Sequence, residues 1–250
     1  MNNAPTSQAW WASSALPNVL KRIPGARSGA RYLRRAYRPA WLGTVRRTRP
    51  LSDFSGYDRG TPVDRYYIDS FIAAHRGDIR GCVLEIQDAR YTSQFGRAVE
   101  RIDVLDIDPA NPRATICADL ARANHISSDQ FDCLVVTQTL QLVYDTRGAV
   151  THMYRILRPG GVLLATVPAL GRMSRHSSDY WRFTVGSIER VFGEVFGQSQ
   201  IQVGSFGNVL AGIAFHLGMA YEELSSRELN VNDPSHPLVV TVRAIKRSPE

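Results

Sequence analysis

Short apolar runs that end in polar or acidic residues recur along the chain from residue 81 onward. Runs of about four to eight residues bounded by turn-forming residues are typical of β-strands. The runs that fit this pattern are residues 82–86, 102–106, 114–117, 131–137, 161–167 and 238–245. We therefore expect a sheet built from these segments.

Helical patterns lie between and after these runs. Residues 146–157 place their apolar side chains on one helical face, and residues 158–161 read as a helix stop followed by a strand start. Residues 188–196 form a second amphipathic stretch. Strands that alternate with helices predict an α/β fold with a doubly wound, mostly parallel sheet, whose ligand lies at the carboxyl ends of the strands.

A further helix is predicted just before the first strand. Thr61 is a capping residue, Pro62 suits the first helical turn, and Asp64 is placed to return the capping bond. The apolar positions that follow with helical spacing are Val63, Tyr67, Phe71 and Ala74. The domain is therefore expected to open with a capped helix.

Charge is distributed unevenly along the chain, which has a net charge of +7. Residues 1–50 hold ten basic residues and no acidic one, whereas residues 51–250 hold 20 basic and 23 acidic residues. We predict a basic, aromatic-containing arm over residues 1–57, in which only residues 26–37 look helical, and a folded domain over residues 58–250. The arm suits an acidic protein partner or a membrane surface. Nucleic acid is disfavoured as a partner because the domain itself is mildly acidic.

The cysteines and the apolar stretches of the sequence indicate in which cellular compartment the protein is expected. The three cysteines are widely spaced and each lies in an apolar run, which fits neither a disulfide framework nor a metal site. The apolar stretch over residues 209–220 is shorter than the roughly 20 residues of a transmembrane helix. Near the amino terminus, apolar residues precede the basic ones, the reverse of a secretory signal. A cytoplasmic protein without a transmembrane segment or metal is expected.

The order of motifs over residues 83–167 resembles the class I S-adenosylmethionine-dependent methyltransferases, and the resemblance extends over about residues 60–247. Three segments, residues 58–67, 180–184 and 206–210, are similar to bacterial methyltransferase-domain proteins of the type 11 kind that are often associated with glycosyltransferases. The resemblance implies a Rossmann-like, seven-stranded α/β sheet and S-adenosylmethionine as the cofactor.

The first site implied by the resemblance follows the first strand. Glu85 takes the position of the family's acid, but the three glycine positions after it hold Gln87, Ala89 and Tyr91. Glycines there let the backbone turn tightly and approach the cofactor closely. By the resemblance, Glu85 and the backbone at Gln87 and Ala89 bind the cofactor; in the alternative, Glu85 only caps the end of its strand.

Acidic residues follow the second and third strands. By the resemblance, Asp106 accepts the ribose hydroxyls of the cofactor, with Asp108 as the reserve, and Asp119 lies near the adenine. All three also suit the start of a turn.

Two amides end the fourth strand, and a tyrosine pair precedes the sheet. The resemblance places Gln138 beside the methionine portion of the cofactor and Gln141 on the route to the acceptor, with a helix cap as the alternative. Tyr66 or Tyr67 is expected to cover the cofactor or to pack into the core.

The segment after the fifth strand carries the candidate acceptor chemistry. A hydroxyl acceptor needs a proton acceptor, for which His176 is the first choice and Asp179 the second. Tyr180 or Trp181 would support a sugar face, and Arg182 would bind an acidic group. In the alternative, this segment is a surface loop that Trp181 and Phe183 pin to the core.

The function that follows is methyl transfer from S-adenosylmethionine, with O-methylation of a sugar-bearing or other small-molecule, natural-product acceptor. Because the glycine motif is degenerate, the alternative is a catalytically inactive partner or scaffold for a glycosyltransferase or biosynthetic enzyme. A dehydrogenase is disfavoured because no Gly-x-Gly-x-x-Gly follows the first strand.

Overall fold

The computed structural model describes residues 43–173 and 178–248. The chain divides into Met1–Arg47 and a compact unit, Thr48–Glu250. In the first unit, Gly43–Val45 form a 3-10 turn, η3, and the expected helix over residues 26–37 lies outside the described residues. The compact unit takes in residues 48–57, which the sequence analysis assigned to the arm: the Leu51 amide donates to the Leu217 carbonyl at 2.7 Å.

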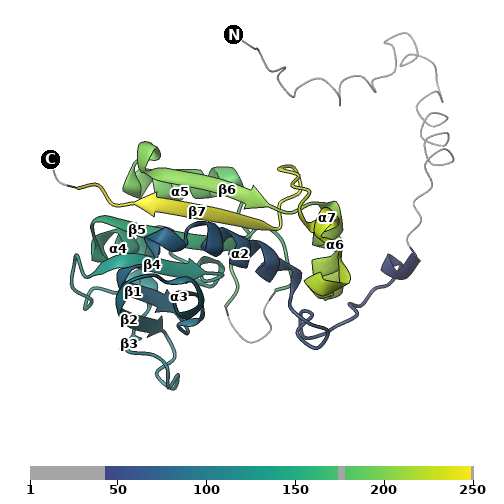
Figure 1. The fold of residues 1–250 in the computed structure, drawn as a ribbon, viewed down its shortest axis with the longest axis horizontal. Coiled ribbons are helices and arrows are strands. Elements are labelled where there is room, and N and C mark those ends of the chain that lie inside the picture. The colour runs from purple at the N-terminus through teal and green to yellow at the C-terminus, as the bar shows by residue number, and fades with distance from the viewer. Residues whose placement is uncertain (1–42, 174–177, 249–250) are drawn as a thin grey trace, which may run out of the picture. The chain divides into compact units, whose positions relative to one another are not determined.

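A seven-stranded sheet forms the centre of this unit (Figure 1). Its strands are β1 (Gly81–Ile86), β2 (Val99–Asp106), β3 (Ile116–Cys117), β4 (Phe131–Thr137), β5 (Leu157–Pro168), β6 (Ile201–Phe206) and β7 (Val239–Ile245). Their order is β3-β2-β1-β4-β5-β7-β6. The first five strands run parallel, and β7 is antiparallel to both neighbours. The expected fold class is confirmed.

The strand β6 was not predicted from the sequence. It lies at the edge of the sheet and pairs only with β7. All its residues are partly or fully exposed, so it lacks the buried apolar run that identifies the central strands. The strand β5 also begins earlier than expected, at Leu157, so the expected turn over residues 158–161 is part of the strand.

Helices cover both faces of the sheet (Figure 1). The α-helices are α2 (Val63–Ala74), α3 (Arg90–Phe95), α4 (Thr146–Ile156), α5 (Val185–Phe196), α6 (Val209–Leu217) and α7 (Ser226–Leu229). Single 3-10 turns are η4 (Arg76–Asp78), η5 (Leu120–Arg122), η6 (Leu140–Leu142), η7 (Gln198–Gln200) and η8 (Tyr221–Glu223). Met153 of α4 and Phe192 of α5 are buried in one core, and Ile68 of α2 and Ala214 of α6 in the other. The two cores lie on opposite sides of β4, as the alternation of side chains along a strand requires.

The start of α2 differs from the capping box predicted for it. The helix begins at Val63, after Pro62, and no side chain caps it. The Thr61 amide instead donates to the Glu222 carboxylate at 3.0 Å. The prediction that Asp64 returns a capping bond is therefore wrong, and its carboxylate is left for another role.

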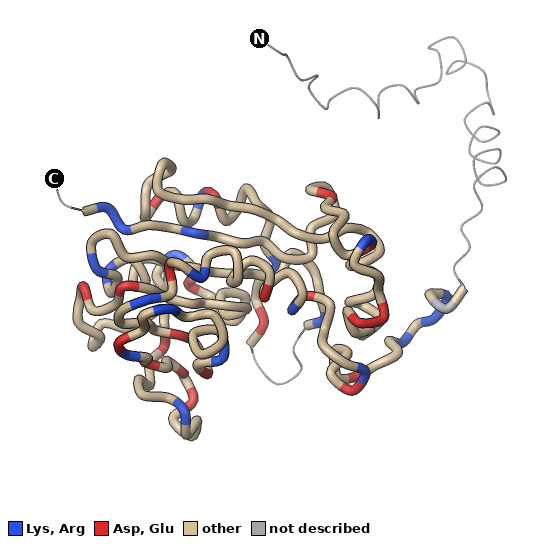
Figure 2. Tube along the Cα trace, viewed as in Figure 1, with Lys and Arg blue, Asp and Glu red and all other residues tan. Residues whose placement is uncertain are grey.

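Charged side chains of both signs are interspersed over the compact unit (Figure 2). This agrees with the nearly balanced count after residue 50. Among the residues that the structure describes, no helix is both long enough and apolar enough to cross a membrane.

Candidate functional site

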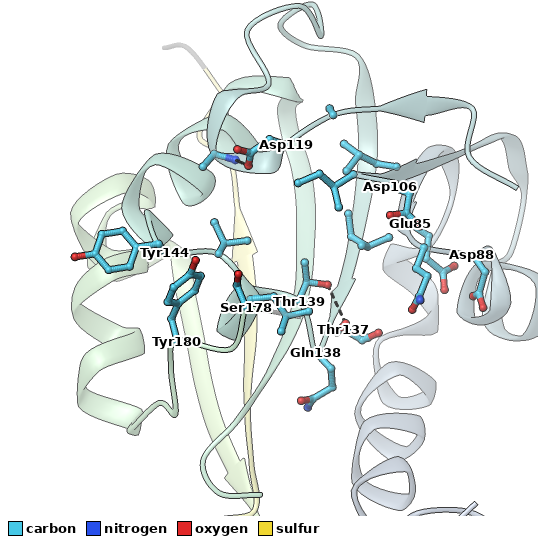
Figure 3. A pocket seen from close by; sticks show the side chains of 18 of the residues that line it. Glu85, Asp88, Asp106, Asp119, Thr137, Gln138, Thr139, Tyr144, Ser178 and Tyr180 are labelled. Atoms are coloured by element: carbon cyan, nitrogen blue, oxygen red, sulfur yellow. Dashed lines mark hydrogen bonds between the residues drawn. The ribbon is translucent and has the colours of Figure 1, made fainter. Parts of the chain in front are cut away.

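A cavity of about 630 Å³ opens at the carboxyl ends of β1, β2 and β4. This is the edge at which open parallel sheets bind ligands, and the volume suits a nucleoside-sized molecule. Figure 3 shows Glu85 and Asp106 on one side of this first cavity and Tyr144 and Tyr180 on the other. The expectation that the site lies at this edge agrees with the position of the cavity.

Glu85, the last-but-one residue of β1, holds the start of α3. Its side chain is 2% exposed, and its two carboxylate oxygens accept the amides of Tyr91 at 2.8 Å and Thr92 at 2.7 Å. Burial raises the pKa of the Glu85 carboxyl, and the hydrogen bonds to Thr92 and Tyr91 oppose that rise. Glu85 lines the cavity and at the same time caps the helix that forms its wall, so both interpretations of this residue have a structural basis.

The loop between β1 and α3 keeps a glycine-like turn without glycine. Gln87, at the first lost glycine position, has φ of 72°, in the left-handed region that favours glycine. Its amide donates to the Leu105 carbonyl at 2.9 Å. Gln87 lines the cavity, whereas Ala89, at the second position, does not. The tight turn is therefore preserved, at a cost of about 1–2 kcal/mol in backbone strain.

Asp106, the last residue of β2, lines the cavity and is held in place from two sides. Its Oδ1 accepts the Asp108 amide at 3.0 Å, and its Oδ2 accepts Asn111 Nδ2 at 2.6 Å. Asn111 Nδ2 also donates to the Gln87 carbonyl at 2.8 Å, which ties the ends of β1 and β2 together. Asp108 is exposed, does not line the cavity and caps its own turn through the Ala110 amide. Of the two carboxylates, only Asp106 lines this cavity, and its contact with a ribose stays a prediction.

Asp119 follows β3 and also lines the cavity. Its Oδ1 accepts the Ala121 amide at 2.9 Å at the start of η5. Asp119 therefore begins a turn, as one of its two interpretations predicts. Leu105 and Ala118 line the same cavity as Asp119, and a contact between Asp119 and adenine stays a prediction. These two apolar side chains and Ile107 offer a slot for a flat base.

Gln138 and Gln141 follow β4 and carry unpaired amide atoms. Gln138 has φ of 49°, and its Nε2 is buried without a hydrogen-bond partner. Gln141 Nε2 donates to the Gln138 carbonyl at 2.8 Å, while Gln141 Oε1 is buried and has no partner. An unpaired buried amide is costly, so these atoms are suited to bind a ligand.

A second cavity of about 550 Å³ adjoins the first. The two share Tyr57, Arg65, Gln138 and Leu142 as lining residues. The remaining lining comes from residues 53–55, the start of α2, the end of β5 and residues 170–173, and from Gln141, Asp179, Arg182 and Phe215. Gln141 lines only this second cavity, away from β1 and β2. The two cavities therefore meet near the carboxyl end of β4, where Gln138 lines both of them.

Three aromatic side chains form a cluster beside the first cavity. The Tyr144 ring lies 5.3 Å from the Tyr180 ring, edge to face, and 5.9 Å from the Trp181 ring, nearly stacked. Trp181 Nε1 donates to the Val143 carbonyl at 3.1 Å. Tyr144 and Tyr180 line the first cavity, but Trp181 lines neither of the two. Trp181 is 39% exposed and packs on Tyr144, whereas Phe183 is buried in the core, so of the two side chains expected to pin this segment only Phe183 does so. A contact of Trp181 with the acceptor stays a prediction.

The predicted proton acceptors are placed as follows. His176 lies outside the described residues. Asp179 lines the second cavity with a side chain that is 5% exposed, and Arg182 donates to its two oxygens at 2.6 and 3.0 Å. Arg182 Nη2 also donates to the Arg172 carbonyl. A proton taken up by Asp179 would remove the negative charge of this ion pair, and Arg182 also holds the loop through the Arg172 carbonyl.

The tyrosine pair on α2 does not cover the first cavity. Tyr66 donates to Asn230 Oδ1 at 2.8 Å and packs against the Tyr221 ring, and Tyr67 is buried and donates to the Leu229 carbonyl. The interpretation of Tyr66 as a lid is wrong, because its ring contacts the segment around α7 and η8. The side chain from this helix that reaches the first cavity is Arg65.

Several site residues were not identified from the sequence, among them Tyr57, Asp64, Arg65, Asn111 and Tyr144. Asp64 and Arg65 lie within the segment 58–67 that carries part of the family resemblance, so a signal was present, but we assigned it to the neighbouring tyrosines. Asn111 and Tyr144 lie in loops without a periodic pattern. Only the sheet order brings these loops to one edge.

The residues present fit S-adenosylmethionine. A carboxylate ends β2, an apolar slot lies beside it, and the β1–α3 turn has the backbone conformation that close approach requires. The unpaired Gln138 amide lies farther along the same cavity. Asp106 would hold the ribose, and the loop at Gln87 would face the methionine portion.

Comparisons with known proteins agree with this fit. A family model described as a methyltransferase domain matches residues 88–165. The ubiquinone/menaquinone biosynthesis C-methyltransferase UbiE of Marinomonas sp. (strain MWYL1) is 26% identical over 128 residues, covering 40% of this chain and 51% of the relative. The chain thus spans about half the length of that curated relative.

One of the similar solved structures shares the fold. A putative sarcosine dimethylglycine methyltransferase from Galdieria sulphuraria matches with a TM-score of 0.50 and 14% identity, over 74% of this chain and 90% of that one. An S-adenosylmethionine-dependent methyltransferase from Archaeoglobus fulgidus has a TM-score of 0.49 and 10% identity, over 77% and 98% of the two chains. The matched domain and the cavity at the strand ends make this chain similar to the class I S-adenosylmethionine-dependent methyltransferases, and the cavity fits S-adenosylmethionine as a cofactor.

Proposed function

We propose that the chain transfers the methyl group of S-adenosylmethionine, bound in the first cavity, to a hydroxyl oxygen of a sugar-bearing acceptor in the second cavity. The observation that carries this proposal is the set of unpaired polar atoms around the second cavity. Nine buried side-chain polar atoms of the described residues lack a hydrogen-bond partner. Five of them belong to lining residues of this cavity: Asp64 Oδ1, Arg65 Nε, Gln138 Nε2, Gln141 Oε1 and Arg182 Nε.

These atoms favour a hydroxyl-rich group. Three of them are donors and two are acceptors, and each costs about 1–3 kcal/mol when it is buried unpaired. A hydroxyl both donates and accepts, so neighbouring sugar hydroxyls can satisfy donors and acceptors in one small volume. An acceptor with such hydroxyls would recover part of this cost on binding.

The charge balance of the second cavity points the same way. Its lining holds three guanidinium groups, on Arg65, Arg172 and Arg182, and three aspartates. With no net charge, the lining selects neither a cationic nor an anionic acceptor by charge alone. Tyr57 and Phe215 add aromatic walls of the kind on which the apolar faces of sugars pack.

The cofactor supplies an electrophilic methyl group on a sulfonium, and the side chains of this protein would orient the cofactor and the acceptor. Asp106 would orient the ribose through charge-assisted hydrogen bonds. The Gln138 side chain lines both cavities and would contact the region where methyl donor and acceptor meet. Alignment of the two reactants can account for much of the rate enhancement in such a displacement.

Calorimetric titration with S-adenosylhomocysteine and a transfer assay test the proposal together. We expect one cofactor product bound per chain and transfer of labelled methyl from S-adenosylmethionine to methyl α-D-glucopyranoside or UDP-glucose. The product should resist alkaline hydrolysis, because an ether survives conditions that cleave a methyl ester. Binding without transfer to these probes would overturn the hydroxyl acceptor, and absence of binding would favour the scaffold function.

We further propose that the basic arm binds an acidic partner protein, such as a glycosyltransferase, independently of the cofactor. A chain that begins at Thr48 should keep its affinity for S-adenosylhomocysteine within about twofold. It should lose retention on a heparin column, which presents a polyanion, because nine of the ten basic residues of the first fifty are removed. Equal retention of the shortened and full chains would place the basic surface elsewhere.

A further inference from the structure

Asp64 combines burial, an unpaired oxygen and a place on the second cavity. It is the second residue of α2, is 8% exposed and lines this cavity. Its Oδ1 is buried without a hydrogen-bond partner, and its Oδ2 lies 4.0 Å from Arg65 Nε. The carboxylate does not return the predicted capping bond to Thr61, whose amide donates to Glu222 instead.

The other carboxylates at this cavity differ from Asp64. Asp179 accepts two hydrogen bonds from Arg182, and Asp53 is exposed. Among the aspartates that the structure describes here, Asp64 is the one with a buried oxygen left unpaired. Its neighbour Arg65 lines both cavities and donates to the Tyr91 hydroxyl at 3.1 Å, which fixes this stretch of α2 against α3.

The surroundings also make this carboxylate more basic than one in water. Burial raises the pKa of the Asp64 carboxyl, the Arg65 guanidinium and nearby backbone amides oppose that rise, and the Asp69 charge adds to it. A buried carboxylate whose charge is poorly solvated gains more from taking up a proton.

We propose that Asp64 is the general base of the transfer reaction and takes the proton of the acceptor hydroxyl. This inference rests on the proposed function. In the step, the hydroxyl oxygen forms a bond to the methyl carbon while the methyl–sulfur bond breaks and its electron pair stays on sulfur. The hydroxyl proton passes to a carboxylate oxygen of Asp64, so the ether and the sulfide product are both neutral at the reacting atoms.

The test compares Asp64→Asn with Asp69→Asn in the full chain. Asp69 lies on the same helix, also has a buried, unpaired Oδ1 and a pKa raised by burial, but lines neither cavity. With methyl α-D-glucopyranoside or UDP-glucose as the acceptor, kcat of Asp64→Asn should fall by roughly 10²–10⁴. Its affinity for S-adenosylhomocysteine should stay within about threefold, and Asp64→Glu should recover part of the rate. Asp69→Asn should keep kcat within about threefold of the unaltered chain.

Melting temperature separates a base from a structural residue. Because Asn removes a buried charge without changing shape, Asp64→Asn should melt no lower than the unaltered chain, whereas a stabilising role would lower its melting temperature. If Asp64→Asn does not fold, Asp64→Ser bound to S-adenosylhomocysteine is compared with the unaltered chain for kcat and melting temperature in its place. An unchanged kcat in a folded Asp64 variant would contradict the assignment of Asp64 as the general base and would leave the proposed function intact. No transfer by the unaltered chain to either probe overturns both.

Discussion

Replacement of Glu85 by alanine should lower the free energy of unfolding by about 2–4 kcal/mol and abolish measurable binding of S-adenosylhomocysteine. The substitution leaves the amides of Tyr91 and Thr92 without acceptors in a buried position, and each such loss costs about 1–3 kcal/mol. Relief of the buried charge offsets part of that cost. Urea denaturation and calorimetric titration measure the two effects.

Asp88→Ala is the matched control for this prediction. Asp88 Oδ1 also accepts an amide at the start of α3, that of Arg90 at 3.0 Å, but this hydrogen bond is exposed, so water can replace the acceptor. We expect Asp88→Ala to lower the free energy of unfolding by less than about 1 kcal/mol. A Glu85→Ala chain of unchanged stability that has lost cofactor binding would show that Glu85 acts only as a ligand.

Asp106→Asn should weaken binding of S-adenosylhomocysteine by roughly tenfold to a hundredfold with little change in melting temperature. Hydrogen bonds to a charged group contribute about 1.5–3 kcal/mol each, and the amide keeps the shape of the side chain. The amide oxygen can still accept the Asp108 amide, so the turn after β2 should persist. The new amide nitrogen cannot accept from Asn111 Nδ2, and loss of that one hydrogen bond should cost about 1 kcal/mol of stability. Titration calorimetry gives the affinity and differential scanning fluorimetry the melting temperature.

Asp108→Asn makes the same change two residues later, outside the cavity. Its carboxylate is exposed and accepts the Ala110 amide at 2.9 Å, which an asparagine side chain can also do. We expect an affinity within about twofold of the unaltered chain. Equal losses from Asp106→Asn and Asp108→Asn would mean that the net charge of the loop, and not the position of one carboxylate, determines binding.

The lost glycines show why the cofactor motif could not be judged from the sequence. Gln87 carries a side chain at a position that usually holds glycine, yet its φ of 72° keeps the turn. Residue type indicates which backbone conformations are inexpensive, but the surrounding hydrogen bonds decide which one is adopted. Here the Gln87 amide and carbonyl are bound by Leu105 and Asn111, so the neighbouring strand maintains the conformation.

The sequence by itself determined the α/β fold, the central strands and the two carboxylates at the carboxyl ends of β1 and β2, Glu85 and Asp106. These follow from local periodicity and from the rule that ligands meet a parallel sheet at its carboxyl edge. The unequal distribution of charge between the arm and the domain was equally plain in the sequence.

Only the tertiary structure decided which residues surround the second cavity. Asp64, Gln138 and Arg182 are far apart in the chain and become neighbours of one cavity through strand order and the packing of α2. The same packing turned Tyr66 toward Asn230 and left Arg65 at the first cavity. Periodicity identifies the buried face of a helix, but the partner of each remaining side chain depends on contacts between distant segments, which have no local signature in the sequence.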